Sequence, residues 1–187
     1  MLTRSYPLFL LQITKIMNDN NDERLPLVDE QGRITGSATR GECHNGSKRL
    51  HPVVHLHVFN ERGDIFLQHR PAWKSIQPDR WDTAVGGHVD LGETIEEALQ
   101  RETREEIGLT HFEARAVATY VFESAVEREL VHVFTTHTEE MPHPSCEPDG
   151  GRFFSENEIR LRLGTGFFTP NFEQEWLRFF SRQDDAE

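Results

Sequence analysis

The stretch Gly87–Leu109, GHVDLGETIEEALQRETREEIGL, combines a glycine-bearing loop, a helix and a helix stop. Gly86 and Gly87 allow backbone conformations that other residues resist, so the segment is expected to open as a loop. A helix is predicted from about Glu93, because acidic residues occupy its first turn, where the helix dipole favours negative charge. Gly108 is a typical residue at which such a helix ends. The stretch therefore predicts a loop–helix unit, called the box segment below.

One stripe of the predicted helix changes from apolar to acidic along its length. The 4-3-4 spacing places four residues on the stripe and a fifth beside it: Ile95, Leu99, Glu102 and Glu106, with Glu105 next to Glu102. Neighbouring carboxylates repel one another unless a cation lies between them. Oxygen ligands of this kind suit Mg²⁺ or Mn²⁺, which also bind substrate phosphates. The alternative is a solvated acidic helix with Glu–Arg pairs, which composition alone would favour.

The complete spacing of the box segment is more specific than its composition. It resembles the Nudix box, G-x5-E-x7-R-E-U-x-E-E-x-G-U, in which U is a bulky apolar residue, and it departs only at Thr103. The resemblance implies an α/β fold, an α/β/α sandwich with a mixed central sheet. It also implies a hydrolase that cleaves a diphosphate linked to another group.

The resemblance further implies roles for the residues of the box segment. Metal ligands for Mg²⁺ or Mn²⁺ would be the Gly87 carbonyl and the carboxylates of Glu102, Glu105 and Glu106. Arg101 would orient the glutamates, and Glu93 would brace the loop against the helix. The catalytic base stays open among Glu105, Glu129 and Glu147.

Composition limits the other function classes. The chain has 187 residues, with 20 Lys and Arg against 32 Asp and Glu, a formal net charge of −12. Such a charge argues against broad nucleic-acid binding, which requires a basic surface. The two cysteines, Cys43 and Cys146, form no disulfide framework, so a cytoplasmic location is expected. No apolar run approaches the roughly 18 residues that a membrane span requires, so no membrane contact is expected.

Three regions are expected along the chain. Residues 1–23 are predicted to be a flexible N-terminal extension, 24–182 a single domain and 183–187 a polar tail. Strands are predicted within 24–39, 50–60, 65–69, 112–123 and 128–138, with helices from about Ser155 and over 171–182. The second predicted helix carries an aromatic stripe, interpreted as core packing.

Histidines gather on one face of the strand predicted over 50–60. His51, His55 and His57 alternate with apolar residues there, which favours a ligand or substrate role for at least one of them. A single histidine in this place would more often be a packed core residue. Arg70 and Lys74 follow the next strand, and cations there could neutralise a substrate phosphate.

The residues outside the box segment resemble one Nudix branch, the type I isopentenyl diphosphate isomerases. The match implies a second divalent metal site with five ligands: His44, His51, His88, Glu127 and Glu129. It also assigns Arg70 and Lys74 to diphosphate binding. Mixed nitrogen and carboxylate ligands suit Mn²⁺, Fe²⁺ or Zn²⁺ better than Mg²⁺. However, Gly86 stands where the isomerases carry a catalytic cysteine, and without that thiol one of two proton-transfer groups is missing.

The sequence therefore predicts a metal-dependent hydrolase that cleaves a small-molecule diphosphate by attack of water on phosphorus. Its catalytic residues would be Glu105, Glu106, Glu102, Arg101 and Glu129. An isomerase is the alternative enzyme, and a diphosphate-binding module without catalysis is the third class. The sequence specifies neither the organic part of the substrate nor the oligomeric state, and it leaves a homodimer open.

Overall fold

A computed structural model of the chain describes residues 20–74, 76–144 and 150–181. The strands are β1 Arg24–Val28, β2 Ile34–Thr39, β3 Leu50–Phe59, β4 Ile65–His69, β5 Trp81–Asp82, β6 Val85–His88, β7 Arg115–Glu123, β8 Arg128–His137 and β9 Gly151–Phe154. The helices are α2 Arg40–Cys43, α3 Ile95–Ile107, α4 Glu156–Arg160 and α5 Pro170–Glu175, continued by the π-helix η1 Trp176–Phe180.

Strand β3 is the centre of a mixed seven-stranded sheet. Its main path runs β5-β4-β3-β8-β7, while β6 pairs with β3 and β9 pairs with β4. The β3–β8 pair is parallel and sets His51 opposite Glu129, whereas β6 runs antiparallel to β3 and sets His88 opposite Val53. Strands β1 and β2 form a separate hairpin. These pairings bring residues distant in sequence to the middle of one sheet.

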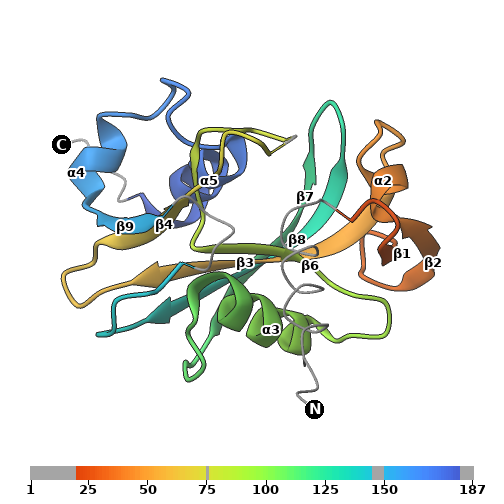
Figure 1. Cartoon of the computed structure of the whole chain (residues 1–187), viewed down its shortest axis with the longest axis horizontal. Coiled ribbons are helices and arrows are strands. Elements are labelled where there is room, and N and C mark those ends of the chain that lie inside the picture. The colour runs from red at the N-terminus through yellow and green to blue at the C-terminus, as the bar shows by residue number, and fades with distance from the viewer. Residues whose placement is uncertain (1–19, 75, 145–149, 182–187) are drawn as a thin grey trace, which may run out of the picture.

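Helices cover both faces of this sheet, which confirms the predicted α/β/α sandwich. Figure 1 shows α3 on one side of the sheet and α4 and α5 on the other. Val54, Leu56 and Val58 of β3 pack with the apolar side of α3. Val53, which alternates with them, packs in a cluster that includes residues of β7, β8 and η1. The period-2 alternation of β3 thus separates two cores.

Helix α3 begins later than the sequence predicted. Its N-cap is Thr94, whose side chain accepts a hydrogen bond from the Glu97 backbone while Glu97 accepts one from Thr94 in return. Gly108 ends the helix at φ 69°, a left-handed conformation that favours glycine. Glu93 lies before the cap and is therefore free to bind the loop, as described below.

Two other predicted elements differ from the structure. The polar segment 40–48, for which the sequence predicted no helix or strand, contains the short helix α2, which Thr39 and Glu42 cap reciprocally. The helix expected over 171–182 begins at Pro170 and changes to π geometry at Trp176. The expected Ser155 cap of α4 is confirmed, with Glu158 completing its capping box.

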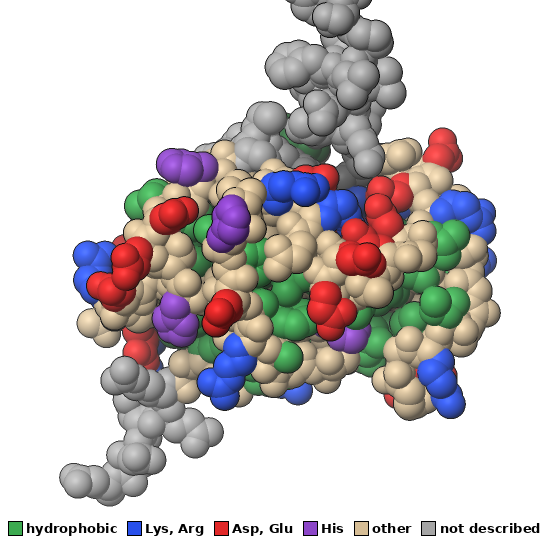
Figure 2. Space-filling view, turned by 90° about the horizontal axis from the view of Figure 1, so that it is seen from below, with side chains coloured by type: hydrophobic (Ala, Val, Ile, Leu, Met, Phe, Trp, Pro, Cys, Tyr) green, Lys and Arg blue, Asp and Glu red, His purple; other side chains and the backbone are tan. Residues whose placement is uncertain are grey.

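The described helices are all too short or too polar to cross a membrane. On the face seen in Figure 2, acidic and basic side chains are interspersed among apolar ones over the described atoms in view. The predicted limits of the domain stay a prediction, and residues 1–19 and 182–187 lie outside the described residues.

Candidate active site and metal centre

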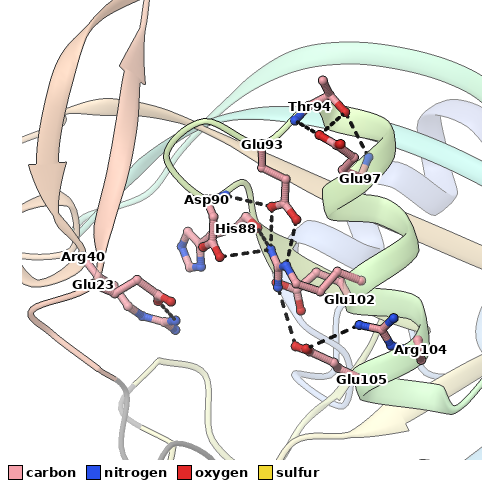
Figure 3. Close-up of polar contacts among 11 residues, drawn as sticks. Glu23, Arg40, His88, Asp90, Glu93, Thr94, Glu97, Glu102, Arg104 and Glu105 are labelled. Atoms are coloured by element: carbon pink, nitrogen blue, oxygen red, sulfur yellow. Dashed lines mark hydrogen bonds and ion pairs between the residues drawn. The ribbon is translucent and has the colours of Figure 1, made fainter.

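Arg101 ties the loop of the box segment to helix α3. Its Nε and Nη2 donate to the two oxygens of Glu93, at 2.9 and 2.8 Å, and Nη2 also donates to the His88 carbonyl at 3.0 Å (Figure 3). Glu93 Oε2 accepts a further hydrogen bond from the Asp90 backbone N–H at 3.0 Å. This network fixes the loop against the helix.

Glu102 lies in the narrow space between α3 and the loop. Arg101 Nη1 donates to Glu102 Oε1 at 2.7 Å. A Cβ at position 87 would stand 2.1 Å from Glu102 Cδ, so any side chain there would displace the Glu102 carboxylate. Burial raises the pKa of Glu102 to about 7, although the Arg101 charge opposes the shift. The carboxylate therefore occupies a site where a cation would stabilise its charged form.

Glu105 and Glu106 have different surroundings. Glu106 Oε2 accepts hydrogen bonds from Gln68 Nε2 at 2.7 Å and from the Gly86 backbone N–H at 3.2 Å. The Glu105 side chain is 56% exposed, with one oxygen 3.6 Å from Arg101 Nη1. The box segment thus offers carboxylates on one helix side beside the Gly87 backbone, a donor set that fits Mg²⁺ or Mn²⁺.

A second cluster converges more closely than the box glutamates. Within the described residues, one group of at least three side chains brings its ligand atoms within 4.8 Å of one another: His44, His51, His88 and Glu129. They come from the end of α2, from β3, from β6 and from β8. The Nε2 atoms of His44 and His88 are 3.1 Å apart. Glu127 completes the predicted set, with Oε2 at 3.7 Å from His44 Nε2.

The state of His51 fits a divalent metal. Its Nδ1 is 2.9 Å from the Arg49 carbonyl, and this contact assigns the Nδ1 hydrogen and leaves a lone pair on Nε2. Nε2 is buried and has no hydrogen-bond partner. Burial lowers the pKa of both His51 and His88, which favours their neutral, metal-binding form.

The two carboxylates of this cluster also fit a cation. Burial raises the pKa of Glu127, and burial together with the Glu127 charge raises that of Glu129 to about 8. Glu127 directly precedes β8 and Glu129 lies within it, and two buried carboxylates so close together are costly to ionise without a compensating charge. We call His44, His51, His88, Glu127 and Glu129 the histidine centre.

One cavity of about 200 Å³ joins the two clusters. Its wall includes Gly87, Glu102 and Glu106 from the box segment and His44, His88, Glu127 and Glu129 from the histidine centre. Arg70 and Lys74, the predicted substrate cations, line the same cavity. Arg70 Nη1 donates to Asp82 at 3.1 Å, and the guanidinium also donates to two backbone carbonyls of the loop. The fold thus places most of the predicted site residues around one cavity, whereas Arg101, Glu105 and His51 are not among the residues that line it.

The sequence analysis missed a buried network beside this cavity. Glu175 of α5 is fully buried and contacts three side chains: His55 Nδ1 at 2.7 Å, His57 Nε2 at 2.5 Å and Tyr120 Oη at 2.7 Å. Burial opposes ionisation of Glu175, but the neighbouring histidines outweigh it and hold its pKa low. Burial likewise lowers the pKa of His55, yet the Glu175 charge outweighs this effect and raises it to about 9.

A sequence signal for Glu175 did exist. It lies three residues after Phe172 and directly before Trp176, on the face that the aromatic stripe marks as buried. Asn171 and Gln68, which line the cavity, carried no comparable signal. Glu147 and Cys146 lie outside the described residues, and Cys43 is packed in a core cluster where burial raises the pKa of its thiol to about 11.

Comparison with known proteins identifies relatives of this chain. An isopentenyl-diphosphate Delta-isomerase of Kocuria rhizophila is 34% identical over 140 residues, which cover 69% of this chain and 76% of that protein. A Nudix hydrolase of Deinococcus radiodurans is 29% identical over 173 residues, 90% of this chain and 100% of that protein. The crystal structure of DR0079 from Deinococcus radiodurans matches with a TM-score of 0.74 and 26% identity, over 85% of this chain and 100% of that one.

The family model described as NUDIX domain matches residues 49–174, which contain the box segment and most of the histidine centre. The resemblance inferred from the spacing is thereby confirmed, and the chain belongs to the Nudix family.

Proposed function

We propose that the chain is a metal-dependent hydrolase that cleaves the diphosphate bond of a small organic diphosphate by attack of water on phosphorus. The observation that carries this proposal is the shared cavity, in which Gly87, Glu102 and Glu106 face the same space as Arg70 and Lys74. Acidic groups that suit divalent cations therefore adjoin basic groups that suit phosphate oxygens. The Nudix hydrolases among its relatives support the hydrolase class.

The residues of the box segment would hold Mg²⁺ or Mn²⁺ through Glu102, Glu105, Glu106 and the Gly87 carbonyl. Such an ion, when bound, offsets phosphate charge and lowers the pKa of a coordinated water. Arg101 keeps Glu102 in place, and Gln68 and the Gly86 N–H fix one oxygen of Glu106. Preorganised carboxylates of this kind need no rearrangement when the substrate enters.

Arg70 and Lys74 bind the diphosphate in this proposal. The hydrogen bonds from Arg70 to Asp82 and to the loop carbonyls fix the direction of its guanidinium. Glu105 and Glu129 are the candidate bases among the described residues, the first at the exposed side of α3 and the second inside the histidine centre.

Cleavage of the diphosphate bond, followed by chromatography of the products, tests the proposal, because a nucleotide sugar yields two organic monophosphates and no free phosphate. The purified full chain, with Mg²⁺ or Mn²⁺, is assayed on nucleoside diphosphates, nucleotide sugars, thiamine diphosphate and prenyl diphosphates. Glu105→Gln and Glu106→Gln are expected to reduce turnover of the best substrate by orders of magnitude, and a chelator is expected to abolish it. Glu96→Gln removes an exposed carboxylate from the same helix and serves as the control. Full activity in both box variants would refute the assignment.

The histidine centre and the isomerase relatives favour a second candidate, an isopentenyl diphosphate isomerase. Gly86 argues against it, because glycine supplies no proton. A Cβ at this position would lie 3.5 Å from Thr83 Oγ1 and 3.7 Å from the His55 ring, which are ordinary van der Waals contacts for a Cβ. Conversion of isopentenyl to dimethylallyl diphosphate by the wild type would establish the isomerase. Conversion only by Gly86→Cys would show that the missing thiol separates the two reactions.

A further inference from the structure

A second cavity lies between the end of η1 and the sheet, where β3 and β8 end and β7 begins. We call it the η1 pocket. Its volume is about 380 Å³, and small-molecule sites in proteins usually enclose about 300–1,000 Å³. None of the residues that line it also lines the cavity beside the box segment, so the η1 pocket is separate from the candidate active site.

Aromatic rings form the apolar wall of the η1 pocket. The ring centroids of Phe59, the last residue of β3, and Phe180 of η1 are 5.6 Å apart, and Phe179 lies 6.2 Å from Phe180. The Phe180 ring also packs 4.5 Å from the ring of His57, which Glu175 holds in place. The wall is therefore supported from behind, and it offers an aromatic surface to a ligand without a prior rearrangement.

The charged side chains of the η1 pocket are basic. Of the described residues that line it, Arg115 of β7 and His137 of β8 carry basic side chains and none carries a carboxylate. The His137 ring lies 5.8 Å from that of Phe59, next to the aromatic wall. Since the whole chain has a formal net charge of −12, composition alone would not produce such a wall. The pocket complements an anionic group on an apolar body.

A bulge in β7 directs Arg115 toward this pocket. The register of β7 on β8 shifts at Val117, which is an extra residue on β7. Beyond the shift Arg115 pairs with Thr135, which itself lines the pocket. In an unbroken register Arg115 would face Thr136 and project from the other side of the sheet, because successive residues of a strand alternate between its faces. Bulges often redirect a side chain in this way beside a functional site.

We propose that the η1 pocket binds a small organic anion with an aromatic body, such as an aromatic carboxylate. The rings of Phe59, Phe179 and Phe180 contact the aromatic body, and Arg115 binds the anionic group. This inference does not rest on the proposed function, because the two cavities share no residue.

Two matched fluorescent probes test the proposal on the full chain. Anilinonaphthalene sulfonate carries an anionic group on an aromatic body, and phenylnaphthylamine is the same body without the charge. The sulfonate is expected to bind saturably, with one molecule per chain. Arg115→Gln is expected to weaken its binding about 3- to 10-fold, the range for a charged contact between an exposed and a half-buried setting, and to leave the neutral probe unaffected.

Deletion of Val117 is a second variant, because it restores the unbroken register and turns Arg115 to the other face. It is expected to cause the same selective loss for the sulfonate. Circular dichroism checks its fold, and Arg115→Gln decides alone if the deletion variant does not fold. Arg33→Gln removes an equal charge from an exposed side chain near the β1–β2 turn and controls for the change in net charge. Inorganic diphosphate with Mg²⁺, added to occupy the other cavity, is expected not to displace the sulfonate.

The proposal is overturned if the sulfonate does not bind saturably, or if diphosphate displaces it. It is also overturned if Arg115→Gln weakens both probes equally or neither of them, or if the folded deletion variant keeps the wild-type selectivity. Sedimentation of the wild type supplies the last outcome. A dimer that the sulfonate dissociates would assign the pocket to a second copy of the chain and overturn the proposal as well.

Discussion

The histidines of β3 form two groups with different surroundings. His51 lies near the start of the strand. Its Nε2 has no hydrogen-bond partner, and the ring lies close to the other ligand atoms of the histidine centre. His55 and His57, on the same strand face, are bound by the buried carboxylate of Glu175. Each strand position thus meets a different neighbour: β6 and β8 bring ligands to His51, whereas α5 brings a carboxylate to the other two.

A buried ring nitrogen without a hydrogen-bond partner does not by itself distinguish the two groups. His57 Nδ1 is also buried without a partner, yet its ring packs against Phe172 and Phe180. The two histidines differ in their neighbours. Several potential metal-ligand atoms lie close to His51, whereas aromatic rings pack against His57. The comparison teaches that a metal site is indicated by what surrounds the unpaired atom.

The largest expected effect is a loss of folding stability when Glu175 is replaced. Glu175→Gln removes the only carboxylate that contacts His55 and His57 among the described residues, and leaves two buried imidazoles without a charge partner. Removing one member of a buried ion pair typically costs about 3–5 kcal/mol. Urea unfolding should show a loss of stability of that order. Glu173→Gln, one half-turn away and able to keep its hydrogen bond to Gly164, should change little. A loss below about 1 kcal/mol in Glu175→Gln would contradict the ionic description.

The same pair predicts how stability depends on pH. The folded pKa of His55 is about 9 against an ordinary 6.5, so its contribution is fully present below pH 6.5 and is lost as the pH rises through 9. The pKa of Glu175 is lowered, so its contribution is present above its ordinary value of 4.5 and is lost as the pH falls through its folded value. The stability difference between wild type and Glu175→Gln should therefore be greatest near pH 5–6 and shrink by up to about 3 kcal/mol by pH 9.5. Unfolding curves at several pH values measure this, and a constant difference would refute it.

Metal binding at the histidine centre is expected to raise the free energy of unfolding by about 2–3 kcal/mol. A divalent ion at 100 times its dissociation constant stabilises the folded chain by about 2.7 kcal/mol. Mn²⁺ should therefore raise the Tm of the wild type, and His51→Ala should lose most of this rise. His57→Ala should be less stable but keep the response to Mn²⁺, while exposed His111→Ala should match the wild type. An equal loss of response in the His51 and His57 variants would remove the distinction between the two groups.

The smallest predicted effect concerns an unpaired atom that is not a ligand. Thr103 of α3 is fully buried, and its Oγ1 has no hydrogen-bond partner. Thr103→Val keeps the shape and removes the unsatisfied hydroxyl, so stability should rise by up to about 1 kcal/mol. Thermal unfolding measures the gain, with exposed Thr110→Val as the control. A loss of stability or of Mn²⁺ response would mean that the hydroxyl has a partner in solution.

The sequence indicated which residues lie together in the fold better than it located the ends of the helices. The spacing of the box segment and the histidine motif identified residues that line one cavity, because these patterns combine several residue types at fixed intervals. The start of α3 was misplaced, because acidic residues at 93, 96 and 97 all suit a first turn and only the Thr94–Glu97 capping box decides among them.

The contact of Glu175 with His55 could not be assigned from the chain alone. It depends on α5 lying next to the sheet face that carries His55, which is a tertiary contact between distant segments. The three histidines of β3 were grouped together for the same reason. Strand alternation gives the face of a side chain, but it does not give the neighbour that this face will meet.

The parallel register of β3 and β8 also bears on how the chain folds. His51 and Glu129, which face each other in that register, belong to strands that are distant in sequence, with β4, β5, β6, α3 and β7 between them. A shift of one residue would set His51 opposite Arg128 or Leu130 and turn alternate side chains to the wrong face. Because pairing of such distant strands closes a long loop, it is slow compared with the formation of a local hairpin such as β1–β2. The histidine centre is then complete only after this late step, and metal uptake would report the moment at which the chain reaches its native register.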